Sequence, residues 1–154
     1  MESFDISTED RAQFLKDIEF ARDNQKKDAI TFSAWDFGGQ KVFYALHHAF
    51  LTRYGCYIVV FRMTSLLSTD NASQKEAMNY ITGWLRTIAM HARGTPVALV
   101  GTHKDQIQSK TDHKKVSEQL KEMMKRIKAD LDLEILQNRG DQLCFFPIDN
   151  TLGD

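Results

Sequence analysis

The chain has 154 residues, the size of one domain with a single hydrophobic core. Hydrophobic residues make up 42% of it and charged residues 27%, with 8 Gly and 2 Pro, a composition that excludes collagen, low-complexity chains and long disordered tails. The formal net charge of -1 gives no general attraction to nucleic acid or to an anionic membrane, so a polyanionic ligand must be bound locally.

The first third of the chain predicts a helix, a strand and a second helix. Residues 7–24 start with a capping pattern and continue with apolar side chains at helical spacing, which predicts an amphipathic helix. Residues 29–35 alternate apolar with polar side chains and favour a strand. Residues 41–54 carry apolar side chains at roughly helical intervals up to Gly55, so we expect a helix there.

The remainder of the chain predicts strands at 56–61, 97–101 and 143–148, with helices over 72–93 and 116–131 between them. The run at 56–61 is continuously apolar, which is typical of a strand buried on both faces. The Lys-rich face of the last helix is interpreted as solvated rather than as a nucleic-acid contact. This alternation predicts an α/β three-layer sandwich with a mostly parallel sheet covered on both sides by helices.

The domain organisation that we expect is a single domain over residues 1–154. An N-terminal helix and linker occupy residues 1–28, and the α/β core occupies residues 29–151. Cys56 and Cys144 each stand in an apolar run without metal-ligand spacing, which predicts two reduced thiols in the core. We find neither a signal peptide nor a membrane span in the sequence and therefore expect a cytoplasmic protein.

Three polar clusters follow predicted strands, where the ligands of parallel sheets bind. They are residues 36–40 (Asp-Phe-Gly-Gly-Gln), 102–105 (Thr-His-Lys-Asp) and 149–151 (Asp-Asn-Thr). Hydrophobic packing does not explain why polar side chains stand at these strand ends. The sequence therefore predicts that the three loops converge on one ligand site.

The first cluster has the chemistry of a metal-bound phosphate site. Asp36 at a strand end can hold Mg²⁺ through water, and the glycines Gly38 and Gly39 let a backbone N–H approach a terminal phosphate. Gln40 has the donor and the acceptor that orienting an attacking water requires. Taken alone, this pattern fits a plain strand-to-helix turn equally well.

The second and third clusters have the chemistry of a guanine site. An ionised Asp105 can accept two parallel hydrogen bonds from the N1–H and N2–H edge of guanine, and adenine has no such pair of donors. Leaving such a buried acceptor unpaired can discriminate bases by up to about 10⁴. Thr102 and His103 would flank the base, and backbone amides near Asn150 would meet its O6. In isolation, Thr-His-Lys-Asp is typical of a charged loop.

Together the clusters resemble the third, fourth and fifth guanine-nucleotide motifs of the Ras-like GTPases. The Thr-His-x-Asp at 102–105, Trp35 before the aspartate, and residues 47–52 (His-His-Ala-Phe-Leu-Thr) resemble more narrowly the Roc domain of the ROCO proteins. The resemblance covers about residues 29–151. It implies a signalling domain that binds GTP or GDP with Mg²⁺ and hydrolyses GTP, next to a COR dimerisation domain and other domains of a larger protein.

The resemblance also implies roles for individual residues. Asp36 would be the carboxylate of the magnesium shell, the Gly39 amide would meet the γ-phosphate, and Gln40 would position the attacking water. The guanine base would be held by the residues of the second and third clusters: Thr102, His103, Asp105 and Asn150.

The sequence departs from the family pattern in ways that bear on activity. It contains no Gly-x-x-x-x-Gly-Lys-[Ser/Thr], so the phosphate cradle, its lysine and the direct magnesium hydroxyl are missing. Arg62 also stands where the family often has an acid. We interpret the chain as a Roc-like piece trimmed at both ends that binds nucleotide poorly alone, with hydrolysis expected in the parent protein.

In a Ras-like sheet, the strand that bears this loop lies between the strands predicted at 30–35 and 57–61. Its absence leaves two strand edges unpaired. The gap would then close by direct pairing of those strands, by insertion of residues 3–6, or by strand exchange with another copy.

Two other functions fit parts of the pattern. The first is a nucleotide-incompetent Roc-like module for protein interaction or dimerisation, which would use the open sheet edge or the helix around Trp84. The second is an adenine-nucleotide or flavin-binding protein, and the phosphate fingerprint that it needs is missing as well.

Overall fold

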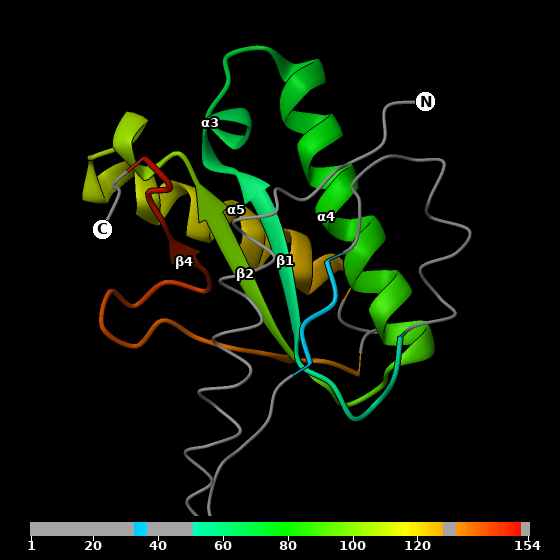
Figure 1. The fold of residues 1–154 in the computed structure, drawn as a ribbon. Helices are drawn as coiled ribbons and strands as arrows, with labels where there is room; N and C mark the ends of the chain where they lie inside the picture. The colour runs from blue at the N-terminus through cyan, green and yellow to red at the C-terminus, as the bar shows by residue number, and fades with distance from the viewer. Residues whose placement is uncertain (1–32, 37–50, 128–131, 152–154) are drawn as a thin grey trace, which may run out of the picture. The chain divides into compact units, whose positions relative to one another are not determined.

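The computed structural model describes residues 33–36, 51–127 and 132–151 (Figure 1). The chain divides into two units, Met1–Gly38 and Gly39–Asp154. In the first unit, residues 33–36 are exposed and have no regular secondary structure, so the predicted strand is not formed over 33–35. The predicted helix over 7–24 and the start of that strand lie outside the described residues.

The second unit contains a parallel sheet in which β2 is the central strand. β1 (Tyr57–Arg62) pairs with β2 (Pro96–Thr102) along its whole length, in a register that places Tyr57 opposite Val97 and Arg62 opposite Thr102. The other edge of β2 pairs with two very short strands. β3 (Glu134–Ile135) lies at its start and β4 (Phe146–Pro147) near its end.

The helices of this unit follow the strands directly. α3 (Met63–Leu66) continues from β1, α4 (Asn71–His91) leads to β2, and α5 (Lys110–Ile127) follows β2 after a 3₁₀ turn. Asp70 caps α4 by accepting hydrogen bonds from the Ala72 and Ser73 amides at 3.1 and 3.0 Å, which satisfies two donors that a helix start otherwise leaves free.

The long predicted elements are confirmed. The predicted helices over 72–93 and 116–131 correspond to α4 and α5, with residues 128–131 outside the described part, and the predicted strands at 56–61 and 97–101 correspond to β1 and β2. The helix predicted over 41–54 is not formed in its described portion, because residues 51–54 make a turn. Gly55 N–H closes that turn by donating to Thr52 O at 3.4 Å.

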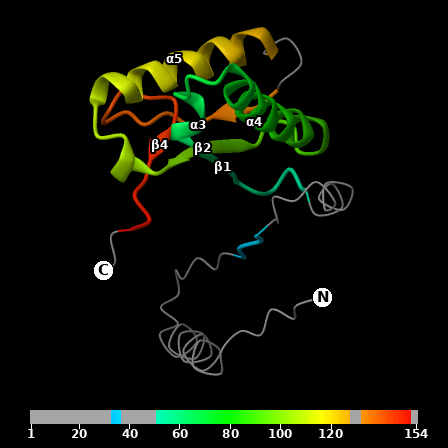
Figure 2. The same ribbon diagram turned by 90° about the horizontal axis from the view of Figure 1, so that it is seen from above.

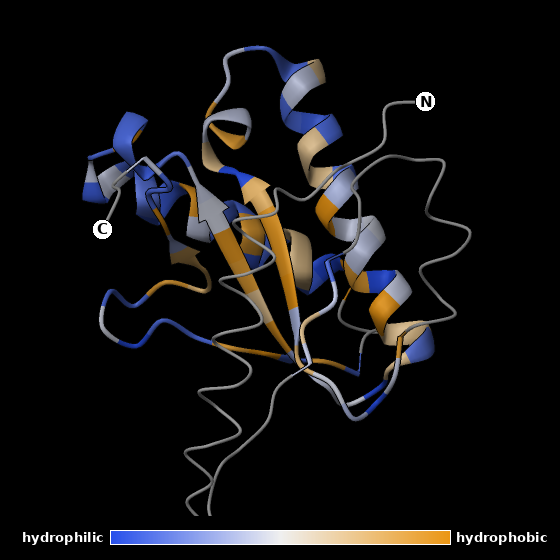
Figure 3. Cartoon of the chain, in the orientation of Figure 1, coloured by the Kyte–Doolittle hydropathy of each residue, from blue (hydrophilic) through white to orange (hydrophobic). Residues whose placement is uncertain are grey.

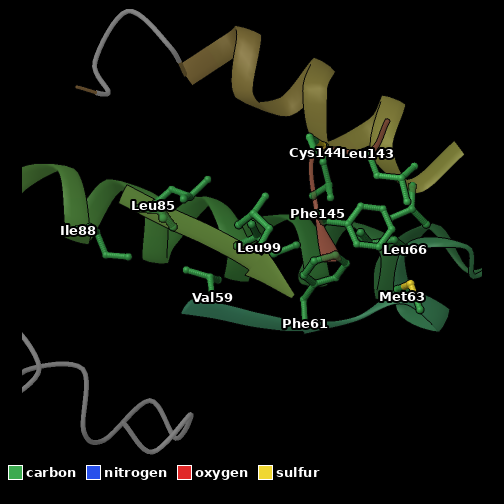
Figure 4. Close-up of a cluster of buried hydrophobic side chains, with 14 of the residues drawn as sticks. Val59, Phe61, Met63, Leu66, Leu85, Ile88, Leu99, Leu143, Cys144 and Phe145 are labelled. Atoms are coloured by element: carbon green, nitrogen blue, oxygen red, sulfur yellow. The ribbon is translucent and has the colours of Figure 1, made fainter. Parts of the chain in front are cut away.

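The core lies on one face of the sheet, where α4 and α5 both pack (Figure 2). It joins side chains of strands, helices and the segment before β4 in one cluster (Figure 4). Its largest fully buried members are Phe145, Met63, Leu66, Ile81, Leu85, Ile88, Leu99 and Leu120. The α/β class with a parallel sheet is therefore confirmed, and the described helices form one of the two expected helical layers.

The prediction that the strand at 56–61 is buried on both faces is wrong for the described residues. Val59 and Phe61 are 3% and 5% exposed, whereas Ile58 and Val60 are 65% and 47% exposed. The middle of β1, residues 58–61, is continuously apolar all the same, and the strand ends in a charged residue, Arg62 (Figure 3). Its side chains alternate between a face that the described helices cover and a face that they do not.

Two further expectations differ from the structure. The strand predicted at 143–148 is reduced to β4, because Leu143 pairs back to Asn138 in an antiparallel bridge before the chain reaches β2. Of the two thiols predicted in the core, Cys144 is buried and Cys56 is exposed, since Cys56 stands just before β1 begins. Among the described helices, none combines the length and hydropathy that a membrane span requires.

Candidate functional site

The carboxyl end of β2 is held to β1 by a side chain. Thr102 is the last residue of β2 and is 7% exposed. Its Oγ1 lies 3.3 Å from the Phe61 carbonyl oxygen, to which it donates, and 2.8 Å from His103 Nδ1. His103 has a left-handed backbone, with φ 65° and ψ 41°, which turns the chain from the strand into the 3₁₀ helix of Lys104–Gln106.

The loop after β4 is joined to the loop after β2 by backbone hydrogen bonds. Ile148 N–H donates to the Gly101 carbonyl at 2.8 Å, and Lys104 N–H donates to the Ile148 carbonyl at 3.1 Å. The second and third polar clusters therefore lie side by side at one end of the sheet, as the sequence predicts for neighbouring parallel strands.

Asp105 offers an uncommitted carboxylate in this loop. It is half-buried within the 3₁₀ helix. Its backbone carbonyl accepts a hydrogen bond from Gln108 Nε2 at 3.4 Å, but within the described ranges no residue hydrogen-bonds or ion-pairs its side chain. Both carboxylate oxygens are available to a ligand that brings its own donors.

The third cluster is ordered by its own aspartate. Asp149 Oδ1 accepts hydrogen bonds from the Thr151 amide at 2.9 Å and from Thr151 Oγ1 at 2.6 Å, an Asx-type turn. The Thr151 amide is thus bonded within its own loop, and ligand binding by backbone amides near Asn150 stays a prediction. Asn150 itself is exposed.

The first cluster is only partly described. Asp36 is exposed in the first unit of the chain, while Gly39 and Gln40 lie outside the described residues. The convergence of this cluster with the other two therefore stays a prediction. The structure brings together the loops that carry Thr102, His103, Asp105 and Asn150.

A groove of about 770 Å³ opens beside Thr102, where β1 ends against α4. Its lining combines hydroxyl groups and apolar side chains with two side chains of opposite charge, Arg62 and Glu76. A second groove, of about 800 Å³ between α4 and α5, contains none of the predicted site residues. The groove beside Thr102 therefore places open space next to one of the converging loops, along the end of β1.

The described residues contain no cluster of three or more histidine, cysteine or acidic side chains that could cage a metal ion. Mg²⁺ in phosphate sites is usually bound through one or two carboxylates together with substrate phosphates. The exposed carboxylate of Asp36 fits that chemistry, as a partial ligand set that a bound nucleotide would complete.

The sequence does not reveal two contributors to the site. The carbonyls of Phe61 and Gly101 position the loops through hydrogen bonds, and backbone atoms leave no signal in a residue pattern. His113 is also missed: its Nε2 lies 2.7 Å from the Ile107 carbonyl, a bond that holds the segment after the 3₁₀ helix against α5. A histidine in the first turn of a Lys-rich helix gave no reason to expect this.

A parallel sheet with polar loops gathered at the carboxyl ends of its strands defines a class of α/β proteins that bind their ligands at that edge. Comparison with known proteins narrows the class. Residues 4–105, more than half of the chain, match the family model "Ras of Complex, Roc, domain of DAPkinase". The chain belongs to this Roc family, the Ras-like GTPase domains of ROCO proteins, and is a GTPase-like signalling domain.

Relatives of the chain are large proteins. It is 34% identical over 98 residues to the probable serine/threonine-protein kinase pats1 of Dictyostelium discoideum, covering 64% of the chain and 3% of that protein. It is 37% identical over 93 residues to the cyclic GMP-binding protein C of the same organism, covering 60% and 3%. It is 27% identical over 99 residues to the leucine-rich repeat serine/threonine-protein kinase 1 of Caenorhabditis elegans, covering 64% and 4%. No solved structure matches the chain.

Proposed function

We propose that the chain carries the guanine-binding end of a Roc domain that switches between GTP and GDP within a larger protein. The observation that supports this most directly is the half-buried carboxylate of Asp105, to which no group of residues 33–36, 51–127 and 132–151 is bonded. It stands in a loop that is tied to β1 through Thr102 and to the loop after β4 through Ile148.

The base would be recognised by hydrogen bonding to Asp105. Guanine presents N1–H and N2–H side by side, and an ionised carboxylate accepts both. Adenine would leave the half-buried carboxylate unpaired, which costs more than the loss of a favourable contact. The loop of Thr102 and His103 would flank the ring, and the loop at Asn150 would approach the O6 edge.

The phosphates would be held by the first polar cluster. Asp36 would bind Mg²⁺ through water, the Gly39 amide would meet the γ-phosphate, and Gln40 would orient the water that attacks it, giving GDP and phosphate. Bound Mg²⁺ supplies charge neutralisation of the phosphate oxygens. This hydrolysis belongs to the parent protein, because the sequence contains no Gly-x-x-x-x-Gly-Lys-[Ser/Thr] cradle.

Ligand-dependent stability tests nucleotide binding. A ligand present at 100 times its dissociation constant raises the free energy of unfolding by about 2.7 kcal/mol. We expect GDP with Mg²⁺ to raise the Tm in a titration to millimolar concentrations and ADP with Mg²⁺ to leave it unchanged. Equal shifts with both nucleotides, or no shift with either, would contradict guanine binding by this chain.

The role of Asp105 is tested by changing the base and the residue together. Asp105→Asn replaces one acceptor oxygen by a donor and should weaken GDP binding while favouring xanthosine diphosphate, whose base has an oxygen where guanine has N2–H. The measurement is the ratio of the two dissociation constants for each variant. An equal loss of affinity for both bases would contradict the proposed hydrogen bonds between Asp105 and guanine.

A second candidate function is a protein-interaction or dimerisation module. The apolar sheet face at Ile58 and Val60 supports it, since these side chains are 65% and 47% exposed and β1 pairs on one edge only among the described residues. Its partners would be a COR or other domain of the parent protein or a second copy of the chain. This function predicts no effect of nucleotide on the Tm.

A further inference from the structure

At the end of β2, the hydroxyl of Thr102 lies close to two possible hydrogen-bond acceptors but has only one hydrogen to donate. Thr102 Oγ1 lies within hydrogen-bond distance of both the Phe61 carbonyl oxygen and His103 Nδ1, and a threonine hydroxyl has a single hydrogen. If that hydrogen pointed to Nδ1, the contact with Phe61 would be between two oxygens with no hydrogen between them. Both contacts are hydrogen bonds only if Nδ1 carries a hydrogen.

We propose that Thr102 is a positioning residue: its hydroxyl accepts the Nδ1 hydrogen of His103 and donates its own hydrogen to the Phe61 carbonyl. The relay holds the imidazole in the Nδ1–H tautomer, because the hydrogen bond made by one ring nitrogen decides which of the two is protonated. It leaves the other nitrogen, Nε2, as a bare acceptor in the neutral ring.

The surroundings favour a fixed ring. Thr102 is 7% exposed, so its hydroxyl is shielded from competing water, and the Phe61 carbonyl belongs to a strand that pairs with β2 over its whole length. The left-handed backbone of His103 sets the direction from which the ring approaches the hydroxyl. Side chain and backbone thus restrict the same ring.

The consequence for a ligand rests on the proposed function. A purine that packs against His103 would meet a flat ring whose orientation is set before binding, and preorganisation of this kind lowers the entropic cost of association. Thr102 would then contribute to base affinity through His103, in addition to the flanking position proposed for its loop. It would also connect the base loop to the carboxyl end of β1, from which Arg62 leads into α3.

The tautomer can be measured without any nucleotide. Long-range ¹H–¹⁵N spectra of the full chain distinguish the protonated from the bare nitrogen of each of its 5 histidines, with assignment by His103→Gln and His113→Gln. His113 serves as an internal reference with the opposite tautomer. Its Nε2 lies 2.7 Å from the Ile107 carbonyl oxygen, which can only accept, so Nε2 must carry the hydrogen. We expect Nδ1–H for His103 and Nε2–H for His113 at neutral pH.

Two variants test the relay itself. Thr102→Val keeps the shape but removes the hydroxyl, so His103 should lose its single tautomer while the His113 signals stay in place. Thr102→Ser keeps the hydroxyl and should preserve the Nδ1–H form. The relay is overturned if His103 of the unmodified chain is an Nε2–H tautomer, or if Thr102→Val leaves its spectrum unchanged.

The same variants separate the relay from the nucleotide site. Where GDP binds, Thr102→Val should weaken binding by up to about tenfold, the value of one hydrogen bond, and Thr102→Ser should restore it. If GDP binds to none of the variants, the proposed function fails while the tautomer result stands. If GDP binds equally to all three, Thr102 has no positioning role toward the base.

Discussion

At the scale of single residues, the packing at the end of β2 depends on Gly101, where no side chain would fit. A Cβ on Gly101 would lie 2.6 Å from Met63 Cγ and 3.0 Å from Phe145 Cδ2, and both of these side chains are fully buried. The glycine therefore brings β2 close to α3 and to the segment before β4. Its carbonyl is also the acceptor that holds Ile148.

The Gly101→Ala variant tests that packing. Overpacking a filled core costs about 1–3 kcal/mol of the free energy of unfolding, so we expect a loss of this size in urea titrations. Gly83→Ala is the matched control, because nothing lies within 4 Å of a Cβ there and Gly83 stands inside α4, where alanine should add about 0.5–1 kcal/mol. Equal effects of the two substitutions would contradict the packing at Gly101.

The different burial of the two cysteines predicts that their thiols differ in reactivity and that the free energy of unfolding depends on pH. Burial raises the pKa of the Cys144 thiol above its ordinary value, against the smaller opposing effect of its hydrogen bond with Ser117. A thiol whose folded pKa is raised stabilises the fold below the unfolded pKa, and this contribution is lost as the pH rises toward the folded pKa. The free energy of unfolding should thus fall above about pH 8.5.

Cys144→Ala should flatten that alkaline decline, and Cys56→Ala should not, because Cys56 is exposed. The measurement is the slope of the unfolding free energy against pH, which a change in absolute stability does not affect. Iodoacetamide with mass spectrometry gives a second readout, in which the native chain is alkylated at Cys56 alone. Fast alkylation of Cys144 in the native state would refute its burial.

At the scale of elements, successive side chains of β1 point to opposite faces of the sheet. The neighbouring residues Val59 and Val60 therefore lie in different surroundings. Val59→Thr places a hydroxyl in the core, where Val59 is 3% exposed, and should cost about 1–3 kcal/mol of the free energy of unfolding. Val60→Thr makes the same chemical change on the exposed face and should stay within about 0.5 kcal/mol. Chemical denaturation of both variants measures the difference. A similar loss at Val60 would mean that this face is covered.

The long elements could be predicted from the sequence because their signals are local. α4 and α5 carry helical spacing over many residues, and β1 and β2 are apolar runs ended by glycine or polar residues. The short strands β3 and β4 could not, since two residues hold no period and their strand character comes from pairing with β2. Whether an apolar strand is covered on both faces likewise depends on distant segments, as Ile58 shows.

At the scale of the whole molecule, the sequence predicted that the loops after β2 and β4 meet but not which hydrogen bonds join them. The rule that parallel strands end at one edge placed the loops of Asp105 and Asn150 together, and the hydrogen bonds at Ile148 agree with it. The bond from Thr102 to Phe61 spans 41 positions, a separation over which a single sequence shows no pairing. The position of Asp36 relative to this edge stays a prediction.

The open apolar face of the sheet predicts concentration-dependent association. Replacing an exposed apolar side chain by a charged one removes attraction between such faces without disturbing the core. We therefore expect Ile58→Lys to shift the chain toward monomer in size-exclusion chromatography with light scattering, with its Tm unchanged. Met90→Lys is the control, because Met90 is similarly exposed, at 68%, but stands on α4. A chain that stays monomeric over a wide concentration range would contradict this association and would also argue against strand exchange.

Two short strands, β3 and β4, share the same edge of β2. The segment between them is a place where the chain can change in length. Between them, the bridge of Asn138 with Leu143 closes a turn whose residues 139–142 are exposed, while β4 is fixed separately to β2. Exposed, independently closed turns tolerate insertions. Relatives could therefore accommodate extra loops there, and a reporter peptide could be grafted at the same point, with Ile148 and the loop that it orients left in place.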